Sequence, residues 1–220
     1  MKLPQVEKIT TRELREYVAS NETLIVDALD RPAMMASRQG EMIKLFFPKR
    51  RFSSTLLFPK ALRFAKNGLR LKPLGIAAPY PKRIISCPER KTHIVVYDRL
   101  PGEDLRQLVL AGNDEGLDKL PHYLARLHEL GVYFRGIHLG NILWSSAGRF
   151  GLIDIAGMNF KSAALGFRHR VKNLAHLLNT RNDYEIFDHF GRDCFLDQYG
   201  LAARLESCKL ADLKKNLLAS

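Results

Sequence analysis

Residues 132–144 read VYFRGIHLGNILW, and residues 152–157 read LIDIAG. The stretch SSAGRF between these two apolar runs is typical of a turn, so the segment is predicted to form a β-hairpin. The hairpin places Asn141 just before its first strand and Asp154 at the end of its second. An amide and a carboxylate that converge in this way suit a Mg²⁺ ion held between nucleotide phosphates. Asp154 lies in an apolar run, where an unpaired carboxylate is costly to bury, so a metal-ligand role explains its position better than a structural one.

Four helices are expected around this hairpin, in the second half of the chain. Residues 102–112 begin with acids that suit a helix N-terminus. Residues 116–131 carry leucines at helical spacing and end at Gly131. Residues 168–179 and 184–200 are predicted to form the two later helices. This half of the chain is therefore expected to be mainly helical.

Short strands are expected in the first half. Alternation and β-branched residues predict strands at residues 23–29, 41–47, 83–86 and 93–100, separated by turns that contain proline. One basic helix, residues 60–71, interrupts them. The fold class is therefore predicted to be α+β in two lobes. The boundaries place a β-rich lobe at residues 1–97, a connector at residues 98–104 and a helical lobe at residues 105–220.

The net charge of +12 is concentrated in one stretch. Residues 44–91 contain thirteen Lys or Arg and a single acid, whereas the rest of the chain holds 22 basic and 22 acidic residues. One face of the helix at residues 60–71 is expected to carry Lys60, Arg63, Asn67 and Arg70. The pattern indicates a polyanionic partner, such as a phosphorylated lipid, a nucleic acid or nucleotide phosphates. A solvated basic face without a specific ligand is the alternative.

Several classes of protein are disfavoured. No apolar run approaches the ~20 residues that span a bilayer, and the N-terminus has no apolar signal-peptide core. Cys87, Cys194 and Cys208 are odd in number and scattered, which favours reduced thiols. The seven histidines show no zinc-ligand spacing, which argues against a zinc enzyme. These features predict a cytoplasmic protein.

The chain resembles protein-kinase-like folds, and more closely the lipopolysaccharide kinase (Kdo/WaaP)-like family, in the group called toluene tolerance proteins. The likeness runs from Val26 to Leu178 and rests on GEMIKLFFPKR, ALRFAKNGLRLKPLGIAAP, RLPGEDLRQLV, LGVYFRGIHLGNIL and LIDIAG. It implies a bilobal, protein-kinase-like fold with a small β-rich N-lobe and a shortened C-lobe. It also implies ATP and Mg²⁺ as cofactors.

The resemblance implies a role for individual residues as well. Lys44 matches the strand lysine that contacts nucleotide phosphates, although an exposed lysine on an edge strand is the alternative. The interlobe hinge that contacts adenine falls at Tyr97, Asp98 and Arg99. Asn141 matches the catalytic-loop amide, and Asp154 matches the magnesium-binding aspartate. Arg135 stands where the loop arginine would be.

Three parts of the family's site are missing. One is the glycine-rich phosphate loop, because residues 28–40, ALDRPAMMASRQG, offer only Gly40 before the lysine strand. Gly136 replaces the catalytic aspartate, which should lie five residues before Asn141, and residues 45–88 contain no acid that could pair with Lys44. The glycine marks a lost base, and it is also consistent with a backbone conformation that other residues cannot reach. His138, two residues further on, is a candidate substitute base. A structural histidine that hydrogen-bonds the loop is the favoured interpretation.

Three functions follow from these features. The first is an ATP-dependent kinase of the lipopolysaccharide-core type, which phosphorylates a sugar hydroxyl. The basic stretch 44–91 would then bind a phosphorylated glycolipid or another polyanion, in peripheral contact with the inner membrane. The second is a pseudokinase that binds nucleotide or a partner without turnover. The third, a nucleic-acid-binding protein, is disfavoured because the sequence has no nucleic-acid-binding motif.

Overall fold

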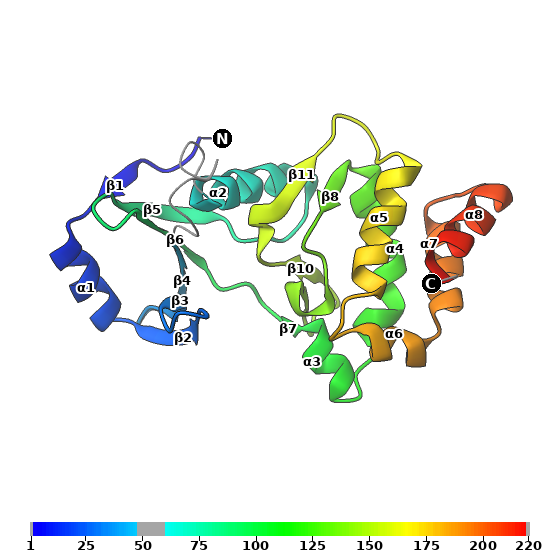
Figure 1. Ribbon diagram of the computed structural model, residues 1–220, viewed down its shortest axis with the longest axis horizontal. Coiled ribbons are helices and arrows are strands. Elements are labelled where there is room, and N and C mark those ends of the chain that lie inside the picture. The colour runs from blue at the N-terminus through cyan, green and yellow to red at the C-terminus, as the bar shows by residue number, and fades with distance from the viewer. Residues whose placement is uncertain (1, 48–59, 219–220) are drawn as a thin grey trace. The chain divides into compact units, whose positions relative to one another are not determined.

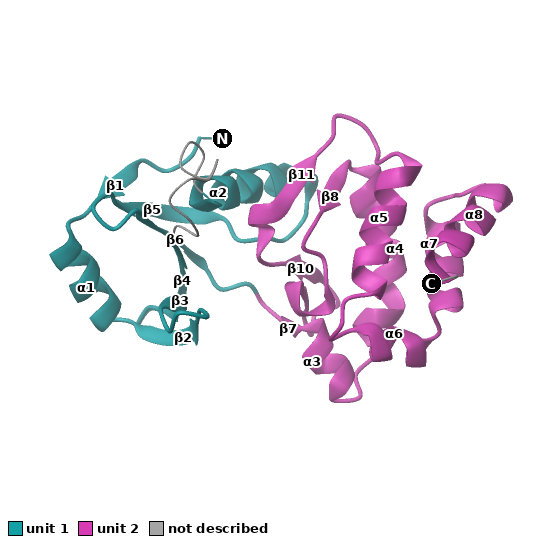
Figure 2. Ribbon diagram, in the orientation of Figure 1, with its two compact units in different colours: residues 1–100 teal, residues 101–220 magenta. Residues whose placement is uncertain are grey.

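A sheet of six strands forms the centre of the first of two units in the computed structural model (Figures 1 and 2). The structure describes residues 2–47 and 60–218; unit 1 is residues 1–100 and unit 2 is residues 101–220. In spatial order the strands are β1 (Val6–Lys8), β5 (Pro81–Cys87), β6 (Thr92–Asp98), β4 (Glu41–Phe46), β3 (Pro32–Ala36) and β2 (Glu22–Val26). The β1–β5 pair is parallel and the other pairs are antiparallel.

The two faces of this sheet carry different helices. Successive residues of a strand point to opposite faces. Ile43 and Leu45 are therefore buried on one face, in a cluster with Leu14 of α1 (Thr11–Ala19). Lys44 points to the other face, where its Nζ lies 5.5 Å from the ring centroid of Phe64 in α2 (Lys60–Leu71). The α1 face and the α2 face are thus separate surfaces of unit 1.

Helix α2 lies close to the segment that precedes β5. A Cβ atom at Gly68 would lie 2.0 Å from the carbonyl oxygen of Pro79, so the approach requires glycine. The ring of Phe64 contacts those of Phe46 and Tyr97, at centroid distances of 5.6 and 5.5 Å. Asn67 was expected on the basic face but is buried. The reason is that it lies three residues after Phe64, on the same side of the helix.

Unit 2 is built mainly from helices. They are α3 (Leu105–Leu110), α4 (Glu115–Glu129), α5 (Phe167–Leu178), α6 (Tyr184–Phe190), α7 (Arg192–Ala202) and α8 (Ser207–Leu218). Two small sheets contain β7 (Glu103–Asp104), β9 (Ile142–Trp144) and β10 (Phe150–Leu152) in one and β8 (Val132–Phe134) with β11 (Met158–Phe160) in the other. Helices α4 and α7 pack against each other. Within residues 2–47 and 60–218, no helix has both the length and the apolar character that a bilayer crossing requires.

The predicted strands and helices are confirmed with three exceptions. The helix expected at residues 102–112 spans only Leu105–Leu110, because Glu103 and Asp104 pair with β9 as strand β7. The strand expected at residues 23–29 ends at Val26, because Asp27 Oδ1 accepts the backbone N–H groups of Leu29 and Arg31 and forms a turn. The single helix expected at residues 184–200 is wrong. The chain forms α6 and α7 instead, separated at Gly191, whose φ of 94° is incompatible with a continuous helix.

Candidate functional site

The predicted hairpin is present in unit 2, and it brings the two candidate metal ligands together. Strands β9 and β10 pair antiparallel, with Ile142 opposite Leu152. Next to this pair, at the open end of the hairpin, the backbone N–H of Ile153 donates to the Asn141 carbonyl oxygen at 3.0 Å. Asn141, in the 3₁₀ turn η3 (Leu139–Asn141), and Asp154, next to Ile153, therefore lie at the same end of the hairpin.

Asp154 has an unusual backbone conformation. Its φ of 50° and ψ of 42° lie in the left-handed region, just before the 3₁₀ turn η4 (Ile155–Gly157). Few residues other than glycine adopt this conformation, and such residues are concentrated at functional sites. The expectation that its carboxylate is buried in the apolar run is wrong, because this turn carries Asp154 to the surface while Leu152 and Ile155 stay in the core. The burial argument for a metal-ligand role is therefore lost. Asp30, Lys91 and Arg204 also have positive φ, so the position of Asp154 beside Asn141 is the stronger argument.

Asn141 is oriented by the residue that takes the place of the missing aspartate. Its Nδ2 donates to the Gly136 carbonyl oxygen at 2.8 Å. Because the amide nitrogen is used in this way, Oδ1 is the side-chain atom suited to bind a cation. The amide oxygen and the Asp154 carboxylate are both hard oxygen donors, the type that Mg²⁺ prefers. The donor set thus fits Mg²⁺, which usually takes its further ligands from phosphates and water.

Gly136 does not hold a conformation that only glycine can adopt. It is absent from the described glycines with positive φ, and a Cβ atom at this position would meet only Phe134 Cε2, at an ordinary distance of 3.8 Å. The backbone explanation for this glycine is therefore wrong. The loop has space for a Cβ atom at this position, and Arg135 beside it is exposed.

Buried side chains hold both ends of the loop formed by residues 135–138. Asn173 of α5 donates from Nδ2 to the Phe134 carbonyl oxygen at 2.7 Å, at the start of the loop. Asp183, which is fully buried, accepts the Leu139 backbone N–H at 2.8 Å on Oδ2, at its end. Arg106 of α3 donates from Nε to the other Asp183 oxygen at 2.5 Å. The loop shape is therefore set by residues that lie far away in the sequence.

Arg106 also determines which ring nitrogen of His138 carries the proton. An arginine side chain only donates hydrogen bonds, so the 3.2 Å contact from Arg106 Nη2 makes His138 Nδ1 the acceptor. Burial, and then the charge of Arg106, lower the pKa of His138. The neutral ring consequently carries its proton on Nε2. A substitute base would need that nitrogen unprotonated, so the geometry favours a structural role for His138.

The segment after Asp154 is tied to the same region. Strand β11 pairs antiparallel with β8, so that Met158 lies opposite Phe134. Further along, the backbone N–H of Lys161 donates to the Gly131 carbonyl oxygen at 2.9 Å, and that of Leu165 donates to the His128 carbonyl oxygen at 2.8 Å. The segment is thus fixed against β8 and the end of α4.

The candidate residues of unit 1 lie on or next to its central strands. Lys44 is half-buried on β4, between β3 and β6, so the edge-strand alternative is wrong. The side chain of Tyr97 is buried, with its hydroxyl 3.6 Å from Met34 Sδ. Asp98 Oδ1 accepts from Lys82 Nζ at 2.9 Å, and Arg99 is exposed. A nucleotide at residues 97–99 would therefore meet backbone groups rather than the tyrosine ring.

Asp183 and Arg106, which hold the loop at residues 135–138, were not predicted from the sequence because no local pattern marks them. Asp183 lies 44 residues after the backbone N–H that it binds, and Arg106 lies 32 residues before His138. In sequence both resemble ordinary surface charges at helix ends. Within the described residues, no group of three or more His, Cys, Asp or Glu side chains gathers as a metal cluster.

Comparisons with known proteins place the fold. No protein-family model and no curated protein matches the chain. The co-crystal structure of WbdD with the kinase inhibitor LY294002 matches over 84% of this chain and 43% of its own, with 16% identity and a TM-score of 0.53. A structure of the bifunctional kinase-methyltransferase WbdD matches over 84% of this chain and 47% of its own, with 14% identity and a TM-score of 0.50. This chain therefore spans less than half the length of either. At such identity the likeness concerns the fold alone, and it shows that this chain has an α+β, protein-kinase-like fold.

Proposed function

We propose that the chain is an ATP- and Mg²⁺-dependent phosphotransferase of the lipopolysaccharide-core kinase type with a degenerate catalytic loop. The observation that carries the proposal is the end of the β9–β10 hairpin, where Asn141 and Asp154 lie together and Asp154 adopts a left-handed backbone conformation. The kinase-like fold supports it. Membership of the Kdo/WaaP-like family, in the toluene tolerance group, belongs to the same proposal.

In this proposal each residue has a defined part. Asn141 Oδ1 and the Asp154 carboxylate hold Mg²⁺, whose charge neutralises the phosphates. Lys44 contacts the nucleotide phosphates, and backbone groups of residues 97–99 contact the base. Arg135 is exposed at the start of the loop, where a phosphorylated acceptor could contact it. The acceptor is a sugar hydroxyl.

The missing aspartate limits the expected rate. Phosphoryl transfer depends mostly on positioning and charge neutralisation, and a general base contributes only about 10²–10⁴ in rate. Asp183 and Asn173 hold the ends of the loop, and Gly136 orients the Asn141 amide. These contacts are consistent with a site that still positions its ligands. We therefore expect slow transfer. A pseudokinase that binds nucleotide without turnover is the second candidate, favoured by the absence of a carboxylate at Gly136.

The partner and the location are part of the same proposal. A phosphorylated glycolipid or another polyanion would bind the basic stretch 44–91. The protein would then work in the cytoplasm, in peripheral contact with the inner membrane. Binding of nucleic acid is disfavoured.

Magnesium-dependent binding of ATP tests the site. Thermal unfolding of the wild type should shift upward with ATP and Mg²⁺ and not with ATP and EDTA, because a ligand at 100 times its Kd stabilises by about 2.7 kcal/mol. Asp154→Asn should lose the shift, since it removes the carboxylate while asparagine tolerates the left-handed conformation. Asp30→Asn is a matched control, because Asp30 is exposed and has a φ of 56°.

Two results would contradict the proposal at this stage. One is a wild type that shows no shift with ATP and Mg²⁺. The other is an Asp154→Asn variant that keeps the full shift while remaining folded. Transfer of labelled phosphate from ATP to core oligosaccharide then separates the two candidates: slow transfer identifies the phosphotransferase, and binding without transfer identifies the pseudokinase.

A further inference from the structure

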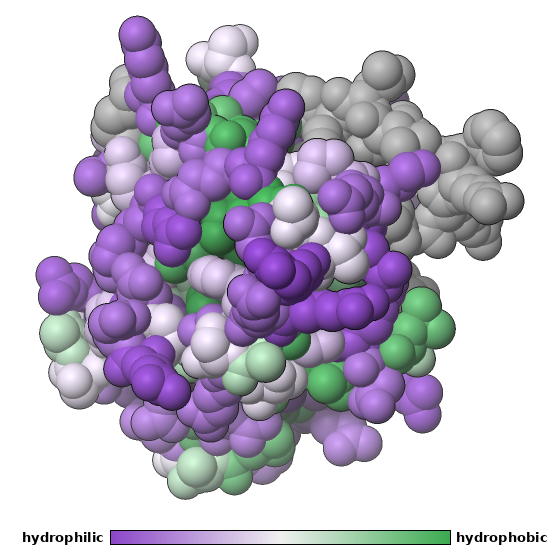
Figure 3. Space-filling model, turned by 90° about the vertical axis from the view of Figure 1, so that its left-hand side faces the viewer, coloured by the Kyte–Doolittle hydropathy of each residue, from purple (hydrophilic) through white to green (hydrophobic). Residues whose placement is uncertain are grey.

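A pocket of about 540 Å³ opens on the α1 face of unit 1. Ligand pockets have volumes of about 300–1,000 Å³, so this one is large enough for a small organic molecule. The space-filling view of this side shows hydrophobic surface set back among hydrophilic side chains (Figure 3). The pocket lies between α1, the start of β3, the end of β4 and the β5–β6 turn.

The inner part of the pocket is apolar. It is lined by Leu14 and Val18 of α1 and by Leu45 and Phe47 at the end of β4. Leu45 belongs to the buried cluster of the α1 face, whereas Lys44 points to the α2 face. A molecule in this pocket would therefore lie on the opposite side of the sheet from Lys44, and it would not be the nucleotide that we assign to Lys44.

The rim of the pocket is cationic. Arg15, Arg31, Arg90 and Lys91 line it, and in the described part of the chain Glu89 is the only acid that does so. The Glu89 carboxylate already accepts hydrogen bonds from the Thr11 backbone N–H, at 3.1 Å, and from the Thr11 hydroxyl. Arg31 is paired with Asp27, so the positive charge at the opening comes from Arg15, Arg90 and Lys91; these three cations outnumber Glu89 and suit an anion.

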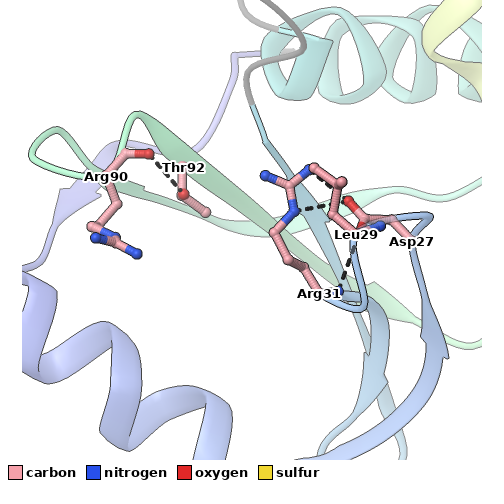
Figure 4. A network of polar contacts seen from close by, with 5 residues as sticks. All are labelled: Asp27, Leu29, Arg31, Arg90 and Thr92. Atoms are coloured by element: carbon pink, nitrogen blue, oxygen red, sulfur yellow. Dashed lines mark hydrogen bonds and ion pairs between the residues drawn. The ribbon is translucent and has the colours of Figure 1, made fainter.

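One of these cations, Arg31, is held in place by the structure around it (Figure 4). Arg31 donates from Nε and Nη2 to Asp27 Oδ2, at 3.0 and 2.6 Å, and its guanidinium lies 4.2 Å from the ring centroid of Phe47. On the β5–β6 turn, Thr92 Oγ1 donates to the Arg90 carbonyl oxygen at 3.1 Å, which orders the backbone of the turn and not the Arg90 side chain. Groups that are ordered before binding lose less entropy when a ligand arrives.

We propose that this pocket binds a single-chain amphipathic anion, with its alkyl chain on the apolar lining and its phosphate-type headgroup on the cationic rim. Apolar contacts alone would not distinguish an anion from a neutral detergent, and the rim alone would bind any phosphate. The combination of both in one pocket selects a molecule that has both parts. This inference stands apart from phosphoryl transfer, because it requires neither Mg²⁺ nor Asp154.

Calorimetric titration with dodecyl phosphate, below its micelle concentration, tests the proposal. We expect saturable binding that is at least about tenfold tighter than that of inorganic phosphate, which lacks the chain, or of dodecyl maltoside, which lacks the charge. Equal binding of dodecyl phosphate and dodecyl maltoside would overturn the proposal. So would equal binding of dodecyl phosphate and inorganic phosphate, or no binding of dodecyl phosphate.

Variants locate the binding in the pocket. Ala19→Trp places a large side chain at an exposed position of the lining, and Arg15→Glu with Arg90→Glu reverses two exposed rim charges. Each should weaken binding of dodecyl phosphate by about tenfold or more. Lys2→Glu with Lys8→Glu is the matched control, because it makes the same charge change at exposed positions outside the pocket. A rim variant that binds as tightly as this control would overturn the proposal.

The test of the pocket and the test of the nucleotide site can fail independently of each other. Asp154→Asn should bind dodecyl phosphate as the wild type does, because Asp154 lies in unit 2. Loss of ATP binding would therefore leave the pocket proposal intact, and loss of dodecyl phosphate binding would leave the nucleotide site intact.

Discussion

At Gly136 the backbone accepts the Cβ atom of a larger residue without a close contact. A Cβ atom there would have its nearest neighbour, Phe134 Cε2, at 3.8 Å. The carbonyl oxygen of Gly136 already orients Asn141, and that contact does not depend on the side chain. What the site lacks at this residue is thus a chemical group and not a suitable shape.

Restoring the carboxylate should raise the rate. We expect Gly136→Asp to increase phosphoryl transfer from ATP by up to about 10²–10⁴, because a base then accepts the proton of the attacking hydroxyl. The measurement is the initial rate of transfer to core oligosaccharide, with hydrolysis of ATP as a second readout. Gly136→Asn has nearly the same size but no carboxylate, and its rate should stay at the wild-type level. Equal rates for the Gly136→Asp and Gly136→Asn variants would contradict the assignment of residue 136 as the position of the base.

Sequence reasoning could identify the residues that a short motif contains. Asn141 and Asp154 were predicted because one hairpin holds both, so local sequence determines their proximity. The loop anchors Asp183 and Asn173 could not be predicted in this way. They reach the loop from α5 and from the residue before α6, and only tertiary packing places them there. The conformation of Asp154 was also missed, because one residue in the left-handed region leaves no periodic signal.

At the scale of helices, a buried polar network joins α4, α5 and α7. His128 of α4 contacts Tyr199 of α7 and Asn173 of α5, at 2.7 Å and 3.0 Å. Since Asn173 Oδ1 can only accept, His128 Nε2 donates to it, and Nδ1 accepts from the Tyr199 hydroxyl. Asn173 also holds the Phe134 carbonyl oxygen. The network therefore links the packing of three helices to the start of the loop at residues 135–138.

This network makes stability depend on pH. Burial lowers the pKa of His128 from 6.5 to about 4. The unfolded chain therefore binds a proton as the pH falls below about 6.5 while the folded protein does not, and stability decreases between about pH 6.5 and pH 4. We expect a loss of up to about 3 kcal/mol across this range. Urea unfolding at a series of pH values measures it.

The contribution of His128 is isolated by comparison. His128→Gln cannot titrate, so its stability should fall less over the same pH range than that of the wild type. His122→Gln makes the same change at an exposed position of α4 and should follow the wild type. If the stability of the wild type and of both variants changed equally with pH, another group would be the cause of the pH dependence.

Elements with a regular pattern could be predicted, and those without one could not. Strands β4 and β6 and helices α2 and α4 have clear alternation or helical spacing, and the structure contains them. Strand β1 went undetected because it has three residues, all exposed. Helix α1 went undetected although Leu14, Tyr17 and Val18 have helical spacing and Thr10 and Glu13 form a capping box, so its signal was present and missed. The division between α6 and α7 depends on the φ of Gly191, since glycine can also occur within a helix.

At the scale of the whole molecule, the charge is divided unequally between the units. Unit 1 holds 20 basic and 9 acidic residues, a net charge of +11, whereas unit 2 holds 15 basic and 14 acidic residues, a net charge of +1. The basic stretch 44–91 lies entirely in unit 1. Long-range attraction to a polyanion should therefore act on unit 1.

Binding to heparin, a model polyanion, tests this distribution. Affinity should decrease as NaCl rises from 0.1 to 1 M, because the screening length falls from about 10 Å to about 3 Å. Arg63→Glu with Lys66→Glu, at exposed positions of α2, should weaken binding more than Lys209→Glu with Lys215→Glu, at exposed positions of α8. Equal effects of the two pairs would mean that total charge, and not its location, determines binding.

The segment that follows Asp154 has a consequence for when the protein becomes competent. Its backbone is bonded to β8 and to the end of α4, so it reaches its position as unit 2 folds. A chain made by cell-free translation, in the absence of modifying enzymes, should therefore leave the ribosome and fold with this segment already ordered. Ordering of this segment would then require no covalent modification.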